Sequence, residues 1–197
     1  SSSAASDVYK RQIVDWAANV MKTKNKTPKI RPPTIWLKML GRVMNTRPGP
    51  CPGSTPNAKQ DEFLRCKKKY VAFGGARGGG KSWAVRCKAK LLALRYAGIK
   101  LLIVRRTLRE LQNNHIDPLR QELAGVAKYK AADKRFEFPN GSVLTFGYCA
   151  CDGDLGQYQG AEYDVVFLDE AGQLQKAWID AINACVRGTN GFPKRTY

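Results

Sequence analysis

The chain has 197 residues, of which 43% are hydrophobic, enough for one globular domain with a sizeable core. Its 34 Lys and Arg against 16 Asp and Glu give a formal net charge of +18, which indicates a polyanionic partner such as nucleic acid. No run approaches the ~18 apolar residues of a membrane span, and no signal peptide is evident, which argues against a membrane protein. The six cysteines lack a disulfide-framework spacing and are expected to be reduced intracellular thiols.

Residues 1–54 are predicted to be a basic, proline-rich and largely flexible tail. Eight Lys or Arg and no acid lie between Lys22 and Arg47, and recurrent prolines prevent a continuous helix or sheet ladder. Two interpretations stay open for this tail: a solvated basic segment, or an arm that touches DNA or a neighbouring subunit.

The folded domain is expected to span residues 55–197. Apolar runs and breaker residues predict four helices, over Asn57–Lys69, Trp83–Tyr96, Thr107–Leu123 (interrupted by Pro118) and Ala177–Val186. They predict three strands, over Tyr70–Phe73, Lys100–Val104 and Asp164–Leu168. A hairpin of Phe136–Phe138 with Ser142–Phe146 is expected on an Asn-Gly turn, and a loop over Asp152–Gly160. Alternating strands and helices predict an α/β fold with a mostly parallel sheet that is flanked by helices, plus the β-hairpin.

A glycine-rich stretch, Gly74–Ser82, lies between the first strand and its helix, and Gly75–Ser82 fits the P-loop pattern G-x-x-x-x-G-K-[ST]. The glycines let backbone N–H groups converge on a phosphate, and the following helix adds its own N–H groups and positive dipole end. Lys81 is expected to reach the β- and γ-phosphates, and Ser82 to hold Mg²⁺. The predicted nucleotide-binding residues of the loop are Gly75, Ala76, Arg77, Gly78, Gly79, Gly80, Lys81 and Ser82.

The apolar strand Asp164–Leu168 is followed by two acids, Asp169 and Glu170. At the carboxyl end of a parallel strand beside the loop, Asp169 is placed to hold Mg²⁺. Glu170 is placed to orient or deprotonate the attacking water. An Asp-Glu pair alone is common at helix starts and surfaces, but here the loop and the acid pair each predict the other.

Phosphoryl transfer also needs positive charge against the transition state. Arg77 lies within the loop, and Arg105 and Arg106 follow the second strand; capping and surface solvation are the alternative roles of these arginines. The predicted catalytic residues are Lys81, Glu170, Arg77 and Arg106. Gln60 lies fifteen residues before Gly75, where its amide is expected to hydrogen-bond adenine, and a plain surface glutamine is the alternative.

Together these residues resemble the ATPase domain of the large terminase subunit, the DNA-packaging motor of tailed bacteriophages. The resemblance spans about Thr55–Tyr197 and rests on Gln60, Gly74–Ser82, Ile103–Glu110, Tyr158–Asp164 and Val165–Ala171. The arginine inside the loop and the Tyr-Gln-Gly-x-Glu-Tyr-Asp run are similar to this family in particular.

The resemblance implies a P-loop NTPase of the additional-strand, catalytic-Glu type that uses ATP and Mg²⁺. It implies a homo-oligomeric ring in the cytoplasm of the bacterial host, which works with a portal protein and a small terminase subunit to drive double-stranded DNA into the capsid. In such a ring Arg105 or Arg106 would complete a neighbour's site. Lys194–Tyr197 is similar to the start of the strand that carries the family's coupling motif, so the chain is expected to be a truncated form that binds ATP and lacks the nuclease domain.

Two alternatives stay open. One is another DNA-translocating P-loop ATPase, of the helicase or recombinase kind. The other is a basic nucleic-acid-binding protein with a non-hydrolysing P-loop, whose DNA binding would depend on salt but not on ATP analogues. The intact Lys81, Ser82, Asp169 and Glu170 argue against the second.

Overall fold

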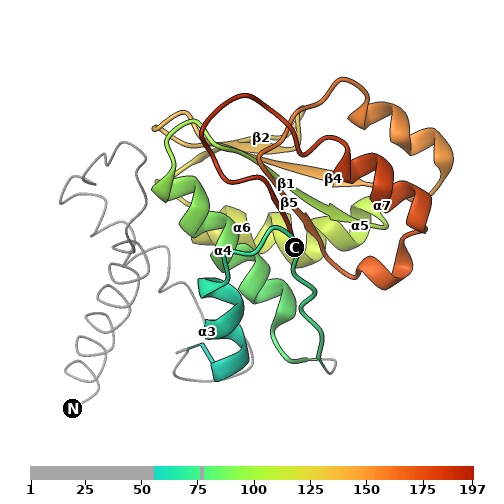
Figure 1. The fold of residues 1–197 in the computed structure, drawn as a ribbon. Helices are drawn as coiled ribbons and strands as arrows, with labels where there is room; N and C mark the ends of the chain where they lie inside the picture. Colours follow the sequence, from blue (N-terminus) through green and yellow to red (C-terminus); the bar gives the residue numbers. More distant parts are fainter. Residues whose placement is uncertain (1–55, 76–77) are drawn as a thin grey trace, which may run out of the picture.

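Six strands form a single sheet in the part of the chain that the computed structural model describes, residues 56–75 and 78–197 (Figure 1). The strand order is β2-β3-β4-β1-β5-β6. The strands are β1 (Lys100–Arg105), β2 (Lys128–Lys130), β3 (Arg135–Glu137), β4 (Val143–Tyr148), β5 (Val165–Leu168) and β6 (Arg195–Thr196). β4, β1, β5 and β6 run parallel, whereas β2, β3 and β4 pair antiparallel. The prediction of an α/β fold with a mostly parallel sheet and a hairpin is confirmed. The predictions for residues 1–54, Ala76 and Arg77 lie outside the described residues.

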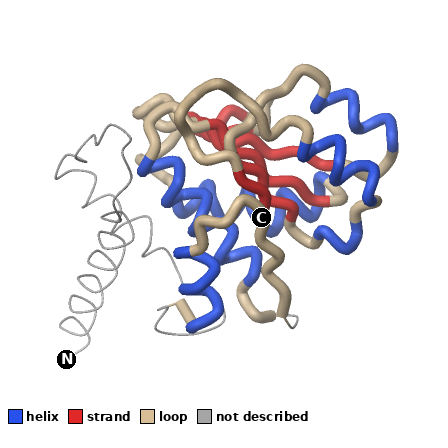
Figure 2. Tube along the Cα trace, viewed as in Figure 1, coloured by secondary structure: helices blue, strands red, loops and turns tan. Residues whose placement is uncertain are grey.

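The alternation of side chains along β1 divides the core between the two faces of the sheet. Leu101 and Ile103 are fully buried against one cluster, and Leu102 and Val104 against the other. The first cluster includes residues of α3 (Ala58–Arg65), α4 (Lys81–Arg95) and α6 (Asp117–Glu122), whereas the second includes residues of η2 (Asp152–Tyr158) and α7 (Lys176–Asn183). Helices therefore cover both faces of the sheet, as Figure 2 shows.

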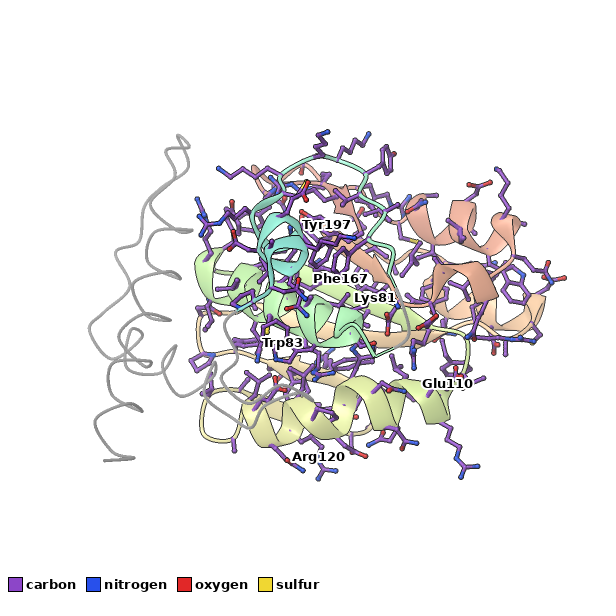
Figure 3. All side chains as sticks on the ribbon, turned by 90° about the horizontal axis from the view of Figure 1, so that it is seen from below. Lys81, Trp83, Glu110, Arg120, Phe167 and Tyr197 are labelled. Atoms are coloured by element: carbon purple, nitrogen blue, oxygen red, sulfur yellow. The ribbon has the colours of Figure 1, made fainter. Side chains whose placement is uncertain are left out.

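A π-helical turn interrupts the helix that follows β1. α5 (Leu108–Leu111) continues through η1 (Gln112–Ile116) into α6, and Figure 3 shows Glu110 and Arg120 on this helical run. Pro118 has no N–H to donate to the carbonyl of Asn114 four residues earlier. Arg86 Nη1 of α4 donates to that carbonyl at 2.5 Å. The predicted interruption near Pro118 is confirmed, as a widened turn.

The segment before the glycine-rich loop is less regular than the predicted strand Tyr70–Phe73. It makes a single parallel bridge, from Tyr70 to Thr196, with Val71 N–H donating to the Thr196 carbonyl at 3.1 Å. The prediction was wrong in extent because its partner β6 has only two residues. The bridge nevertheless places β6 between β5 and the segment that enters the loop, and it confirms a strand in Lys194–Tyr197.

The predicted loop Asp152–Gly160 is for the most part the 3₁₀ helix η2, so that prediction was wrong. The Asp154 carboxylate accepts from the N–H groups of Ala150 and Cys151 at 2.8 and 3.1 Å, which stabilises the first turn. Trp178 Nε1 of α7 donates to Asp152 at 2.6 Å. β2 was missed because it is short and its side chains are only partly buried.

The sequence predicted neither a disulfide framework nor a membrane span. The cysteines of the described segments (Cys66, Cys87, Cys149, Cys151, Cys185) are free thiols. Within those same segments, no helix has the length and hydropathy to cross a membrane.

Close packing between β4 and η2 yields a test of the fold. Tyr158 is buried and donates its hydroxyl to the Tyr148 carbonyl at 2.9 Å. A Cβ at Gly147 would lie 2.9 Å from Tyr158 Cε1 and 3.0 Å from Cζ. We expect Gly147→Ala to lower the free energy of unfolding by about 1–3 kcal/mol, measured by urea denaturation. Gly156→Ala is the control, because its Cβ would meet nothing within 4 Å, and an equal loss in both variants would contradict this packing.

Candidate nucleotide-binding site

One carboxylate oxygen, Asp169 Oδ2, lies where three other elements of the chain converge. Ser82 Oγ, from the first turn of α4, donates to it at 2.8 Å. His115 Nε2, from η1, lies 2.8 Å away. Arg105 Nε, at the end of β1, lies 3.0 Å away as an ion pair without hydrogen-bond alignment. Asp169 follows β5, and its N–H donates to the Val104 carbonyl at 3.0 Å. The parallel pairing of β1 with β5 thus brings both strand ends to one edge of the sheet.

Burial and hydrogen bonding set the charge states of this cluster. Burial lowers the pKa of His115, and the hydrogen bond to Asp169 only partly opposes this, so the imidazole is neutral at pH 7 and donates its Nε2–H. Burial raises the pKa of Asp169, but the hydrogen bond from His115, the charge of Arg105 and the hydrogen bond from the Ser82 hydroxyl outweigh it. The net pKa of Asp169 lies below its usual value, and the carboxylate is ionised.

The described part of the glycine-rich loop wraps the start of α4. Gly80 has φ +72°, a left-handed conformation that a residue with a Cβ adopts only with strain. It directly precedes α4, whose first turn contains no acid. Lys81 Nζ turns back over the loop and donates to the Gly75 carbonyl at 3.0 Å. The start of α4 and the Lys81 ammonium thus lie beside the described part of the glycine-rich loop.

Gln60 contacts the loop directly. Its Nε2 donates to the Gly79 carbonyl at 3.1 Å, and its Oε1 accepts from the N–H of Asn57 at 3.0 Å. The same nitrogen would lie 2.5 Å from a Cβ at Gly80, so a side chain there would displace the Gln60 amide from the Gly79 carbonyl. The amide joins α3 to the loop, and its predicted contact with adenine stays a prediction.

Glu170 adopts the left-handed conformation, with φ 57° and ψ 44°. For a residue with a Cβ this conformation costs on the order of 1–2 kcal/mol. Its side chain is 41% exposed, and its Oε1 lies 3.7 Å from Arg105 Nη2. A solvent-facing carboxylate next to Asp169 is suited to contact a water molecule.

Of the two arginines after β1, Arg105 is buried and contacts both acids, whereas Arg106 is exposed. The structure therefore brings Ser82, Asp169, Glu170 and Arg105 together, whereas Lys81, the neighbour of Ser82 in the chain, directs its ammonium to the Gly75 carbonyl. Arg106 lies on the surface, where its predicted catalytic role stays a prediction. Arg77 lies outside the described residues.

The oxygen atoms of Ser82 and Asp169 fit a magnesium ion. Mg²⁺ binds oxygen octahedrally at ~2.0–2.1 Å, so two adjacent ligands are about 2.9 Å apart. The observed separation of Ser82 Oγ from Asp169 Oδ2 is 2.8 Å. Within the described segments no group of three or more His, Cys, Asp and Glu is arranged for a metal. Two protein oxygens do not complete an octahedral site, so a cation bound here would take its other ligands from outside the protein.

His115 was missed in the sequence. The signal was its position: Leu111, Ile116 and Leu119 are fully buried along the same helical run. A histidine within such an apolar stripe is a buried polar group that requires a partner. No motif in the sequence indicates that this partner is Asp169.

A glycine-rich loop between a strand-like segment and a helix, with an acid at the carboxyl end of a neighbouring parallel strand, is the arrangement of P-loop α/β proteins. Among solved structures, the chain matches the large terminase from a thermophilic bacteriophage in complex with ADP, with a TM-score of 0.57 and 17% identity. Two further crystal structures of the same phage's large terminase match with TM-scores of 0.53 and 0.55, at 15% and 17% identity.

The matches cover 71–73% of this chain, and this chain spans only 37–38% of the length of that terminase. At these identities the similarity is one of fold. The sequence matches no family model and no curated protein. The fold expected from the resemblance to large terminases is therefore supported by structures of one such protein.

The two neighbouring arginines provide a matched test of the site. Arg105→Met removes a buried cation beside Asp169, and we expect the free energy of unfolding to fall by about 3 kcal/mol. Arg106→Met, at an exposed position, is expected to change it by less than ~0.5 kcal/mol. Chemical denaturation of both variants measures the difference, and equal effects would mean that Arg105 does not hold the acids.

Proposed function

We propose that residues 55–197 are the ATP-binding and ATP-hydrolysing domain of a phage large terminase, which powers packaging of double-stranded DNA. The observation that carries this proposal is the 2.8 Å contact between Ser82 Oγ and Asp169 Oδ2. It joins the hydroxyl of a P-loop motif to the acid that ends a neighbouring strand, 87 residues later in the sequence. The fold similarity to the ADP complex of a large terminase supports the same function.

Each residue of the site has a defined task in this proposal. The backbone N–H groups of Gly75–Ser82 bind the phosphates, Lys81 contacts the β- and γ-phosphate oxygens, and Ser82 and Asp169 hold Mg²⁺. When bound, Mg²⁺ neutralises charge on the β- and γ-phosphates. Glu170 orients the attacking water and accepts its proton. The exposure of its carboxylate beside Asp169 supports this assignment.

The sheet supports an additional-strand, catalytic-Glu ATPase. β6 pairs with β5 on one side and bridges Tyr70 on the other, so an extra strand separates the segment that enters the loop from the strand that ends at Asp169. In this proposal Glu170, which directly follows Asp169, is the catalytic glutamate of that ATPase type. Gln60 reaches the same loop from α3.

Arginines supply the remaining positive charge in the proposal. Arg77, inside the loop, and Arg106, at the surface beyond β1, are the proposed catalytic cations. An exposed arginine is suited to act on a neighbour's site in a ring of identical subunits. Arg105 holds the acids within its own subunit.

The proposed partners follow from charge and from the fold similarity. A net charge of +18 favours a polyanion, which we assign as double-stranded DNA. The assembly would be a homo-oligomeric ring with a portal protein and a small terminase subunit, in the cytoplasm of the bacterial host. Residues 1–54, with their many cations, are the proposed arm toward DNA or a neighbouring subunit.

Lys81→Ala and Glu170→Gln separate binding from hydrolysis. We expect Lys81→Ala to weaken binding of a fluorescent ATP analogue about tenfold or more, because it removes charge-assisted hydrogen bonds worth ~1.5–3 kcal/mol. Glu170→Gln is expected to retain binding and to slow ATP turnover by about 10²-fold or more. Fluorescence titration and phosphate release measure the two effects, and wild-type behaviour of both variants would refute the site.

DNA binding is expected to be strongly salt-dependent. If about six phosphates are contacted, the affinity for duplex DNA should fall roughly 10³-fold between 50 and 200 mM salt. For a motor, a non-hydrolysable ATP analogue should change this affinity, whereas Lys81→Ala should not respond to the analogue. Fluorescence anisotropy measures the DNA affinity at each salt concentration, with and without the analogue. If the DNA affinity of the wild-type protein does not change with nucleotide, the non-hydrolysing nucleic-acid-binding alternative is favoured.

A further inference from the structure

His115 is buried completely, and the one hydrogen bond of its ring goes to Asp169. Its side chain has 0% exposure, and its Nε2 lies 2.8 Å from Asp169 Oδ2. Its other ring nitrogen, Nδ1, is buried without a hydrogen-bond partner among the described residues. Because the acceptor is a carboxylate, Nε2 carries the hydrogen, so the nitrogen next to the acid is a donor.

The backbone around His115 is shaped to present this ring. His115 lies in the π-helical turn η1, a rare element that often marks functional positions. The turn is fixed from α4, where Arg86 donates to the Asn114 carbonyl at 2.5 Å. α4 also carries Ser82, the second donor to Asp169. The same helix therefore positions the P-loop hydroxyl and the turn that delivers the imidazole.

We propose that His115 is a positioning residue that fixes the Asp169 carboxylate for Mg²⁺ without touching the metal or the nucleotide. This inference rests on the proposed function, since it assigns Asp169 to the cation. If Ser82 Oγ and Asp169 Oδ2 both bind Mg²⁺, the Ser82 hydroxyl gives a lone pair to the ion and its hydrogen points away from the ion and from Oδ2. The Ser82 hydrogen bond then no longer orients the carboxylate. Arg105 lies near but is not aligned as a hydrogen-bond donor. His115 is then the aligned donor that keeps Oδ2 in place, as outer-shell hydrogen bonds do for metal ligands.

Substitutions at position 115 test this role through magnesium linkage rather than turnover. The measurement is the affinity for a fluorescent ADP, first in EDTA and then as a function of Mg²⁺. His115→Leu removes the donor, and we expect the Mg²⁺ concentration at half-effect to rise about tenfold or more, with the affinity in EDTA unchanged. His115→Gln, whose amide reaches as far as Nε2, should restore the Mg²⁺ response to within about threefold of wild type.

Two further variants exclude a purely structural effect. Leu119→Ala opens the same buried stripe without touching Asp169, and should lower stability while leaving the Mg²⁺ response as in wild type. Should His115→Leu fail to fold, His115→Asn takes its place, because its shorter amide does not reach Asp169 and should behave unlike His115→Gln.

An unchanged Mg²⁺ response in His115→Leu or His115→Asn, or an equal shift in Leu119→Ala, overturns the positioning role alone. Wild-type protein that binds no nucleotide, or Lys81→Ala that binds as wild type does, overturns the proposed function instead. The two failures are therefore distinguishable.

Discussion

The buried carboxylate of Asp169 is the constraint on which the site depends. An ionised acid removed from water must be surrounded by donors and positive charge. Here its Oδ2 accepts hydrogen bonds from Ser82 Oγ and His115 Nε2, both at 2.8 Å, and forms an ion pair with Arg105 Nε at 3.0 Å. These side chains come from α4, η1 and β1, so the carboxylate is satisfied only when the sheet and both helices are in their native positions. The charge that would hold a cation also joins the elements of the fold.

The same edge of the sheet stores strain beside that charge. Glu170 is left-handed, at φ 57°, directly after a carboxylate that is fixed from three sides. The contacts of Asp169 hold the chain in place where it leaves β5, so the change of direction falls on Glu170, the next residue. This turn leaves the Glu170 side chain partly exposed, with Arg105 Nη2 at 3.7 Å. One acid is thereby buried and its neighbour faces solvent, as the proposed roles of cation ligand and water contact require.

The sequence was sufficient for the parts of the site whose chemistry is local. Glycines followed by Lys81 and Ser82, and an apolar run ended by Asp169, specify a loop and a strand end through their own residues, and the structure brings them together. It was not sufficient where a contact depends on topology. That Arg105 rather than Arg106 lies against the acids follows from the alternation of β1 side chains between faces. His115 reaches Asp169 through a π turn, which shifts the side chains after it around the helix and is not written in any local motif.

The position of the loop finally depends on how α4 is anchored, since α4 carries Lys81 and Ser82 at its start. This helix is buried on almost every side, including at Lys88 and Lys90, and a buried ammonium needs partners. Lys88 Nζ donates to the carbonyls of Phe63 and Cys66 at the end of α3, at 2.5 and 2.8 Å, and lies 4.1 Å from the centre of the Tyr197 ring. Tyr197 stacks in turn on Phe167 of β5 at 5.3 Å, and both rings are labelled in Figure 3. Burial lowers the pKa of Lys88 to about 7, whereas the carbonyls and the ring favour the charged form.

Lys90 pairs with Glu122 of α6 at 2.5 Å. These two polar contacts fix α4 to the helices on either side of it, and with α4 the glycine-rich loop is held against the edge of the sheet where Asp169 lies.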